Sequence, residues 1–472
     1  MIRDVECIIG LEIHAQMNTK SKIFCSCPVS EAPPNTNVCE VCLGYPGSKP
    51  RLNRKVFENG IKVAKALNCE VPDNIFFSRK SYFYPDMTKN FQITQYEIPV
   101  GIKGYLTIKW KGDDLKIRIR RAHLEEDPGK LVHVGGDITS SEYTLIDYNR
   151  AGTPLVEIVT EPDFTNPEQV REFLSKLRAI LEHLNVYDSE MIMKADANIS
   201  VKGGARVEVK NITGFNNIMK ALEYEYNRQR IMAKQGIFIK QQETRAYSDK
   251  SKMTKSLRIK ESEADYGYIF EPDLSWQTMT SKRLKNITDN MSELPDERIK
   301  RFVKIYKLTN DTSYVLVYTD KALADFFEEC AKKIKNYSLL ANWTTTHLLK
   351  CLNYNNENIK KSKITPLLFA EFLEKISKGE LSERLGKELV KELVSTGRNI
   401  NAIMKMHKIK VWKNSDIKKI IEKVVKKNEK AVSDYKNGNN NSINFLIGEV
   451  LKETKYQASV EKIREIIMSV MK

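Results

Sequence analysis

The sequence predicts an α+β fold, in which a domain built on a mostly antiparallel sheet precedes two helical domains. The first 290 residues contain many short segments in which apolar and polar residues alternate, with turns and a few helical stretches between them. After Leu294-Pro295 almost every segment has the period of an α-helix. We therefore expect a sheet domain at 1–290, a helical domain at 291–405 and a small helical tail at 406–472.

Length and charge limit the classes of protein to consider. The chain has 472 residues, 41% of them hydrophobic, which is enough for about three globular domains. No run of about 18 apolar residues occurs, and the N-terminus passes directly into a strand pattern. We therefore expect a cytoplasmic protein without a membrane-spanning helix. The net charge of +16 favours an acidic partner such as nucleic acid.

The positive charge is concentrated near the C-terminus. The segment 401–472 contains 16 Lys and Arg residues against 8 Asp and Glu residues. A basic helical tail of this kind favours contact with RNA phosphates, and a solvated surface is the alternative.

The first predicted strand, residues 5–16, has one apolar and one polar face. The apolar face consists of alternate residues, namely Val5, Cys7, Ile9, Leu11, Ile13 and Ala15. Glu12 and His14 lie on the other face, about 7 Å apart along the strand. They are close enough to share a divalent ion, although a Glu-x-His pair is also common in ordinary strands.

Four cysteines follow in two pairs, Cys25-x-Cys27 and Cys39-x-x-Cys42. Four thiolates complete the tetrahedral shell of a zinc ion, and the proline-rich loop between the pairs has little else to hold it. We therefore predict a structural zinc site, with free or redox-active thiols as the alternative. We do not expect a catalytic zinc, because four cysteines leave no open coordination position.

Two charged segments lie at the borders of predicted strands. Arg79 and Lys80 open a loop, 79–89, that mixes cations with aromatic rings and so suits phosphate charge and base stacking. Further on, Glu125, Glu126 and Asp127 are three consecutive carboxylates. Such like charges repel one another unless a cation or a base offsets them.

A predicted hairpin at 193–211 carries polar residues on one face. A three-residue loop, Lys202 to Gly204, pairs Ile199 with Val207 and gives each face one character. A two-residue loop would instead pair Ser200 with Val207 and mix the faces. The three-residue register sets Asp196 opposite Lys210 and Asn198 opposite Glu208. A solvated face is the simplest interpretation, but the repetition of this design in other strands favours a site.

Several long motifs occur in one order along the chain: GLEIHAQ (10–16), PNTNVCEVCLGYPG (34–47), HLEEDPGK (123–130), KADANISV (194–201) and VEVKN (207–211). Together they resemble the GatB family, the B subunits of glutamyl/aspartyl-tRNA amidotransferases. The segment AVSDYKNGNNNSINFLIGEVLKET resembles the YqeY-like tail of the family. The related GatE proteins share these motifs but have a large extra central domain, for which this chain has no room.

The resemblance implies a fold and a reaction. The fold would be a cradle domain similar to glutamine synthetase, then a helical domain and a YqeY-like tRNA-binding tail. In the implied reaction, ATP phosphorylates the side-chain carboxylate of Glu-tRNA(Gln) or Asp-tRNA(Asn). Ammonia released from glutamine by GatA then displaces the phosphate, and GatC completes the complex.

The resemblance also implies site residues. The implied Mg²⁺ ligands are Glu12, His14, Glu125 and Glu208, while Glu126 and Asp196 would serve a second ion or act as a base. Arg79, Lys80 and Lys210 would contact phosphates, and Asn198 and Asn211 would orient substrate or metal-bound water. The four cysteines would hold Zn²⁺.

Two alternatives compete with this interpretation. A non-catalytic tRNA-binding scaffold explains the basic tail, but an RNA-binding surface should exclude the carboxylates on the strand faces. A self-contained amide ligase would need its own glutaminase, and no such signature is present. Ammonia is therefore expected from another protein of the complex.

Overall fold

The computed structural model describes residues 5–135, 141–188, 190–191, 193–259, 267–436, 439 and 441–471. The chain divides into two compact units, Met1–Pro295 and Asp296–Lys472. The boundary coincides with the change of composition near Leu294. Within the described part of the chain, no helix is both long and apolar enough to cross a membrane.

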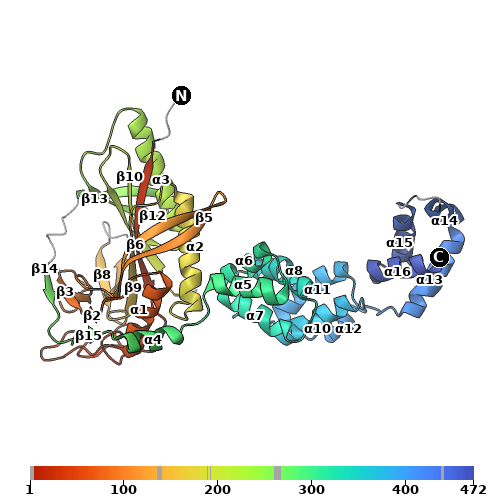
Figure 1. Cartoon of the computed structure of the whole chain (residues 1–472), viewed down its shortest axis with the longest axis horizontal. Coiled ribbons are helices and arrows are strands. Elements are labelled where there is room, and N and C mark those ends of the chain that lie inside the picture. The colour runs from red at the N-terminus through yellow and green to blue at the C-terminus, as the bar shows by residue number, and fades with distance from the viewer. Residues whose placement is uncertain are drawn as a thin grey trace. The chain divides into compact units, whose positions relative to one another are not determined.

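The first unit is built on one eight-stranded sheet with the order β13-β12-β11-β10-β1-β9-β6-β5 (Figure 1). Neighbouring strands are antiparallel, except for the parallel pair β11 and β12. This sheet confirms the predicted α+β class. Its strands are β1 (Cys7–Gln16), β5 (Gly101–Trp110), β6 (Asp113–Glu126), β9 (Pro154–Thr160), β10 (Met193–Val201), β11 (Val207–Thr213), β12 (Glu243–Ser248) and β13 (Met253–Ile259).

Three smaller sheets lie in the same unit. One has the order β14-β3-β4, and the other two are the pairs β15-β2 and β7-β8. Their strands are β2 (Asn74–Ile75), β3 (Ser78–Ser81), β4 (Phe91–Thr94), β7 (Lys130–Val134), β8 (Tyr143–Asp147), β14 (Gly267–Phe270) and β15 (Gln277–Thr278).

The β10–β11 hairpin has the predicted register, but its connection is longer than the predicted three-residue loop: residues 202–206 lie between the strands, and Ala205 N donates to Ile239 O at 2.8 Å. Ile199 pairs with Val207 and Asn198 with Glu208, as the alternation requires. Gly203 adopts a φ of +93°, which glycine reaches without strain. The predicted pairing of Asp196 with Lys210 is wrong, because a bulge between Ala195 and Ala197 sets two residues of β11 opposite Asp196.

Three helices cover one face of the large sheet: α1 (Arg54–Ala66), α2 (Pro167–His183) and α3 (Phe215–Lys234). The first two begin at asparagines whose side chains cap the helix. Asn53 accepts a hydrogen bond from Lys55 N at 2.9 Å, and Asn166 accepts one from Glu168 N at 2.7 Å.

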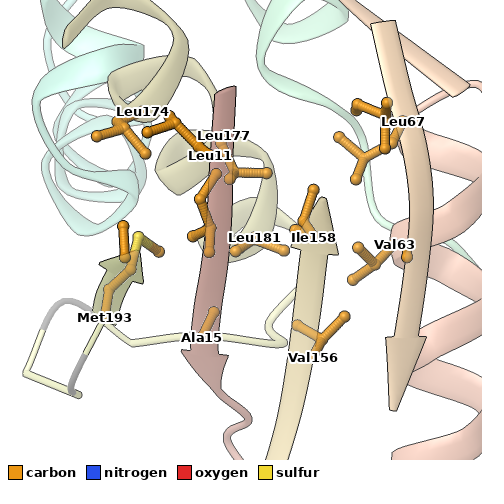
Figure 2. Close-up of a cluster of buried hydrophobic side chains, with 14 of the residues drawn as sticks. Leu11, Ala15, Val63, Leu67, Val156, Ile158, Leu174, Leu177, Leu181 and Met193 are labelled. Atoms are coloured by element: carbon orange, nitrogen blue, oxygen red, sulfur yellow. The ribbon is translucent and has the colours of Figure 1, made fainter. Parts of the chain in front are cut away.

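The core between these helices and the sheet is shown in Figure 2. Alternate residues of β1 and β9 point into it and meet leucines of α2 and residues of α1. The labelled side chains are Leu11, Ala15, Val63, Leu67, Val156, Ile158, Leu174, Leu177, Leu181 and Met193, all of them buried. Because side chains alternate along a strand, the residues between them lie on the opposite face of the sheet.

The second unit is helical. A short helix, α4 (Ser281–Asp289), precedes it. A π-helical segment, Trp343–Leu348, joins α8 to α9. The helices are α5 (Pro295–Tyr306), α6 (Asn310–Thr319), α7 (Lys321–Ala331), α8 (Tyr337–Asn342), α9 (Leu349–Asn355), α10 (Pro366–Ser377), α11 (Glu383–Thr396), α12 (Ile400–Met406), α13 (Asn414–Lys427), α14 (Glu429–Lys436), α15 (Asn441–Glu453) and α16 (Val460–Met471).

The last four helices have an apolar cluster of their own. Side chains of α13, α15 and α16 form it, among them Ile417, Ile421, Leu446, Val450, Ile463 and Ile467. All six are buried.

Candidate active site

The polar face of the large sheet gathers ionisable side chains from five adjacent strands. Register places these residues side by side: Glu12 is opposite Asp196, His14 is opposite Glu157, and Asn198 is opposite Glu208. The face therefore brings together predicted residues from four separate motifs. Its members are Glu12 and His14 of β1, His123 and Glu125 of β6, Glu157 of β9, Asp196 and Asn198 of β10, and Glu208 of β11.

The centre of this face is a cluster of His14, Glu125 and Glu157. One ligand atom from each lies within 4.8 Å of the other two. His14 Nε2 is 3.2 Å from Glu157 Oε2 and 3.7 Å from Glu125 Oε1. His123 approaches the same carboxylate, with its Nε2 at 3.2 Å from Glu157 Oε2. Two buried carboxylates and an imidazole facing one point are a donor set that fits a divalent cation.

The pKa values of His14 and Glu157 show that this cluster favours a positive charge at its centre. Burial opposes a charge on His14, yet Glu157 and then Glu125 raise the pKa of His14 to about 10. Burial also opposes a charge on Glu157, but His123 and His14 hold the pKa of that carboxyl well below its usual range. In the ion-free protein His14 is therefore protonated at neutral pH, and a bound cation would replace that proton.

Beside this cluster lies a second group from β1, β10 and β11, which consists of Glu12, Asn198, Glu208 and Lys210. Asn198 Nδ2 donates a hydrogen bond to Glu12 Oε1 at 3.1 Å, and Lys210 Nζ lies 3.5 Å from Glu208 Oε1. Burial and the neighbouring carboxylates raise the pKa of Glu12. The buried Oδ1 of Asn198 has no hydrogen-bond partner among the described residues. An unsatisfied acceptor beside carboxylates suits a ligand that carries hydrogen-bond donors, such as a metal-bound water.

On the other side of the cluster is a cavity of about 410 Å³. The three cluster residues line it together with aromatic, basic and acidic side chains. They include Lys80, Tyr82, Tyr84, Arg150 and Lys194, and the carboxylates Asp86, Asp127 and Asp196. Its size is within the range of small-molecule sites.

Two predicted site residues lie elsewhere. Glu126 follows Glu125 and so projects from the opposite side of β6, where it is 2.8 Å from Lys89 Nζ and accepts a hydrogen bond from Ile93 N at 2.8 Å. Arg79 donates two hydrogen bonds to Glu271, at 2.7 and 2.9 Å, which occupy its guanidinium.

Lys80 and Asn211 are two further residues that were predicted to belong to the site. Lys80, next to Arg79, does line the cavity. The side chain of Asn211 lies outside the described residues.

Sequence reasoning missed Glu157 and His123. The signal for Glu157 was available, because it is the one charged residue in the strand Pro154–Thr160, whose other residues are mostly apolar. A buried carboxylate in such a strand needs a partner, and the partners come from β1 and β6, which the sequence does not place beside it.

The four predicted zinc ligands come together. The sulfur atoms of Cys25, Cys27, Cys39 and Cys42 lie within 4.8 Å of one another. A hydrogen bond with Cys25 and then Cys39 N–H and Lys22 lower the pKa of Cys42 to about 4, against the effect of burial. This geometry fits a tetrahedral metal ion.

Comparison with known families agrees with this fold. Residues 7–285 match the model of the GatB/GatE catalytic domain, and residues 325–471 match that of the GatB domain. The first match contains the whole acidic face, so fold and site define the class of GatB/GatE catalytic proteins.

Full-length relatives specify the family within this class. Proteins named as the B subunit of aspartyl/glutamyl-tRNA(Asn/Gln) amidotransferase are 41% identical in Thermotoga sp. (strain RQ2), over 98% of both chains, and 41% in Carboxydothermus hydrogenoformans, over 99% of this chain and 98% of the relative. The protein of that name from Saccharolobus solfataricus is 43% identical over 97% of this chain and 98% of its own. The chain belongs to the GatB family of tRNA-dependent amidotransferases, which confirms the resemblance seen in the motifs.

Proposed function

We propose that this chain uses ATP to phosphorylate the side-chain carboxylate of Glu-tRNA(Gln), Asp-tRNA(Asn) or both, so that ammonia can convert it to the amide. The observation that carries the proposal is the convergence of His14, Glu125 and Glu157, from three strands, on one point beside a cavity. The names of the relatives supply the substrate class.

The chemistry explains the composition of the site. A free carboxylate is a poor acyl donor because its leaving group would be oxide, whereas an acyl phosphate has a good leaving group. Forming it brings an anionic acceptor against an anionic triphosphate. Bound Mg²⁺ would neutralise these charges as the two groups approach. Carboxylates on rigid strands are suitable ligands for this ion.

The residues divide by position. Glu125 and Glu157 with His14 would hold one Mg²⁺, and Glu12 and Glu208 would hold a second or share the first. Of the remaining residues, Asp196 would accept a proton from ammonium, Lys210 and Lys80 would contact phosphates, and Asn198 would orient bound water. We leave Glu126 and Arg79 out of the reaction, since each is committed to an ion pair elsewhere.

The chain would work in a complex. The relatives are named as one component of an amidotransferase, so other components are implied. We propose that GatA supplies ammonia from glutamine and that GatC completes the assembly. The basic tail, 406–472, would contact tRNA phosphates. The domain limits 1–290, 291–405 and 406–472 belong to this proposal.

We also assign zinc to the four-cysteine cluster. Zinc bound to four thiolates would cross-link the loop between residues 25 and 42. Lys22 is buried and lies 3.5 Å from Cys42 Sγ, so it would offset part of the negative charge of the thiolates.

The test is to incubate the purified complex with ATP, Mg²⁺, glutamine and each misacylated tRNA, and to identify the esterified amino acid afterwards. Glutamine or asparagine on the tRNA, formed only with ATP, supports the proposal. The alternative, a non-catalytic tRNA-binding scaffold, predicts that Glu12→Ala leaves this product unchanged.

A further inference from the structure

Lys194 is a partly buried cation on the polar face of the large sheet. Its Cα is opposite that of His14 across β10 and β1, and it is on the same face of β10 as Asp196. It also lines the cavity of about 410 Å³. Among the described residues, no carboxylate oxygen forms an ion pair with its Nζ within 4.0 Å. Burial lowers the pKa of Lys194, while the charges of Asp127, Asp196 and Asp86 counter that effect from beyond ion-pair distance. A ligand carboxylate in direct contact would stabilise this partly buried ammonium further.

Arg150, a second cation in the lining of the cavity, is already bonded to the protein. Arg150 Nε donates to Pro128 O at 3.0 Å and its second nitrogen to Gly129 O at 2.7 Å. Arg150 Nε is also 3.4 Å from Asp127 Oδ2. The guanidinium of Arg150 thus binds the backbone at 128–129 and, together with Lys194, offsets the charge of Asp127. Lys80 and Lys130 also line the cavity, but Lys194 lies directly beside His14 in the sheet.

The cavity adjoins one side of the cation cluster. The described lining residues include His14, Glu125 and Glu157 but not Glu12, Asn198 or Glu208. The second acidic group therefore lies across the cluster from the cavity. If the nucleotide is bound by that second group and only its γ-phosphate reaches Lys80 at the cavity, the ligand beside Lys194 is the phosphoryl acceptor.

We propose that Lys194 binds the side-chain carboxylate of the esterified amino acid and that the cavity is the aminoacyl subsite. This inference rests on the proposed function. The Lys194 ammonium donates a hydrogen bond to one carboxylate oxygen and keeps its proton. The other oxygen attacks the γ-phosphorus of ATP, a carboxylate O–P bond forms, the O–P bond to ADP breaks, and ADP leaves. Lys194 thus holds the oxyanion beside His14, Glu125 and Glu157, the residues that would hold the cation.

The test is steady-state kinetics of the assembled complex with Lys194→Gln and Lys194→Arg, with Lys202→Gln as the control. Lys202 lies in the loop of the same hairpin, is exposed and pairs with Glu6. For Lys194→Gln we expect KM for the misacylated tRNA to rise about 10-fold to 100-fold, while KM for ATP stays within about 2-fold. Lys194→Arg keeps the charge and should restore most of the affinity. A rise in KM for ATP alone would reassign Lys194 to the nucleotide, and no change in either KM would overturn the proposal.

A second measurement separates charge recognition from a folding defect. The wild-type complex should bind Glu-tRNA(Gln) more tightly than Gln-tRNA(Gln), because only the first carries the carboxylate. Lys194→Gln should reduce that ratio, whereas a general folding defect weakens both complexes equally. An unchanged ratio contradicts the inference.

The two proposals fail in different ways. If the wild-type complex releases no ADP in response to misacylated tRNA, the proposed function is wrong. If it does release ADP and Lys194→Gln behaves like Lys202→Gln, only the role of Lys194 is wrong.

Discussion

His14 and Glu157 are direct partners across strands β1 and β9, and their side chains meet with Nε2 3.2 Å from Oε2. The pairing depends on register, since a slip of one residue would turn Glu157 into the core. The site is therefore built by strand pairing between segments far apart in the sequence, and its third member, Glu125, comes from the next strand.

The first prediction concerns Glu157. Glu157→Gln removes a charged ligand while keeping the shape of the side chain, so we expect divalent-cation affinity to fall about 10-fold to 100-fold. Titration of the purified chain with Mn²⁺, followed by electron paramagnetic resonance, measures this. The control is Glu161→Gln, which breaks a surface pair with Arg120 in the same region. Equal affinities of the two variants would contradict the assignment.

The second prediction concerns pH. The pKa of His14 is raised to about 10 in the folded protein, against about 6.5 in the unfolded chain. Its stabilising contribution is therefore complete below pH 6.5 and is lost as the pH rises through 10. In the presence of EDTA, the melting temperature should fall less between pH 6.5 and 10 for His14→Gln than for the wild type.

The contribution of Glu157 to stability depends on pH in the opposite direction. Its pKa is lowered by His123 and His14, so its contribution is present above the unfolded value of about 4.3 and is lost as the pH falls below it. For His14, equal falls in melting temperature of the wild type and His14→Gln from pH 6.5 to 10 would contradict the raised pKa of its imidazole.

The third prediction separates Glu126 from its neighbour. Glu126→Gln should leave divalent-cation affinity unchanged, because this side chain is on the other side of β6 with Lys89. It should lower the free energy of unfolding by about 3 kcal/mol, since Lys89 is left as a partly buried, unpaired cation. Cation titration and thermal melting test both effects, and weaker cation binding would place Glu126 in the site.

Much of this arrangement could be predicted from the sequence, because strand alternation determines which side chains share a face. Alternation put Glu12 with His14 and gave the register of Asn198 with Glu208. It also implies that Glu125 and Glu126 point to opposite sides of the strand. The prediction that both belong to the site did not take this into account.

The rest depends on long-range pairing. Glu157 joins the site because β9 lies between β1 and β6 in the sheet, and strand order is not encoded in any local pattern. Long-range pairing also produces the bulge beside Asp196 and the two hydrogen bonds from Arg79 to Glu271. They involve segments that the sequence does not show to be neighbours.

The fourth prediction concerns the cysteine cluster. Purified protein should contain about one zinc per chain, and replacing Cys39 and Cys42 with serine should abolish binding and lower the melting temperature. Atomic absorption measures the metal. Cys69→Ser is a suitable control, because Cys69 is outside the cluster. A fully folded, zinc-free wild type would refute the assignment.

The fifth prediction concerns the tail. Its helices pack around their own apolar cluster, so removing residues 406–472 should leave the first unit folded. We expect tRNA affinity to fall about 10-fold or more, with a weaker dependence on salt, because phosphate contacts are lost. Filter binding at several salt concentrations tests this, and an unchanged affinity would contradict the role of the tail.

The most direct test of the central claim is transfer of label from [γ-³²P]ATP to the misacylated tRNA in the absence of glutamine and ammonia. The account predicts that the wild-type complex labels the side-chain carboxylate of the esterified amino acid, and that Glu12→Ala and Glu157→Gln do not. Amidation by the wild type without any labelled intermediate, or undiminished labelling by both variants, would contradict it.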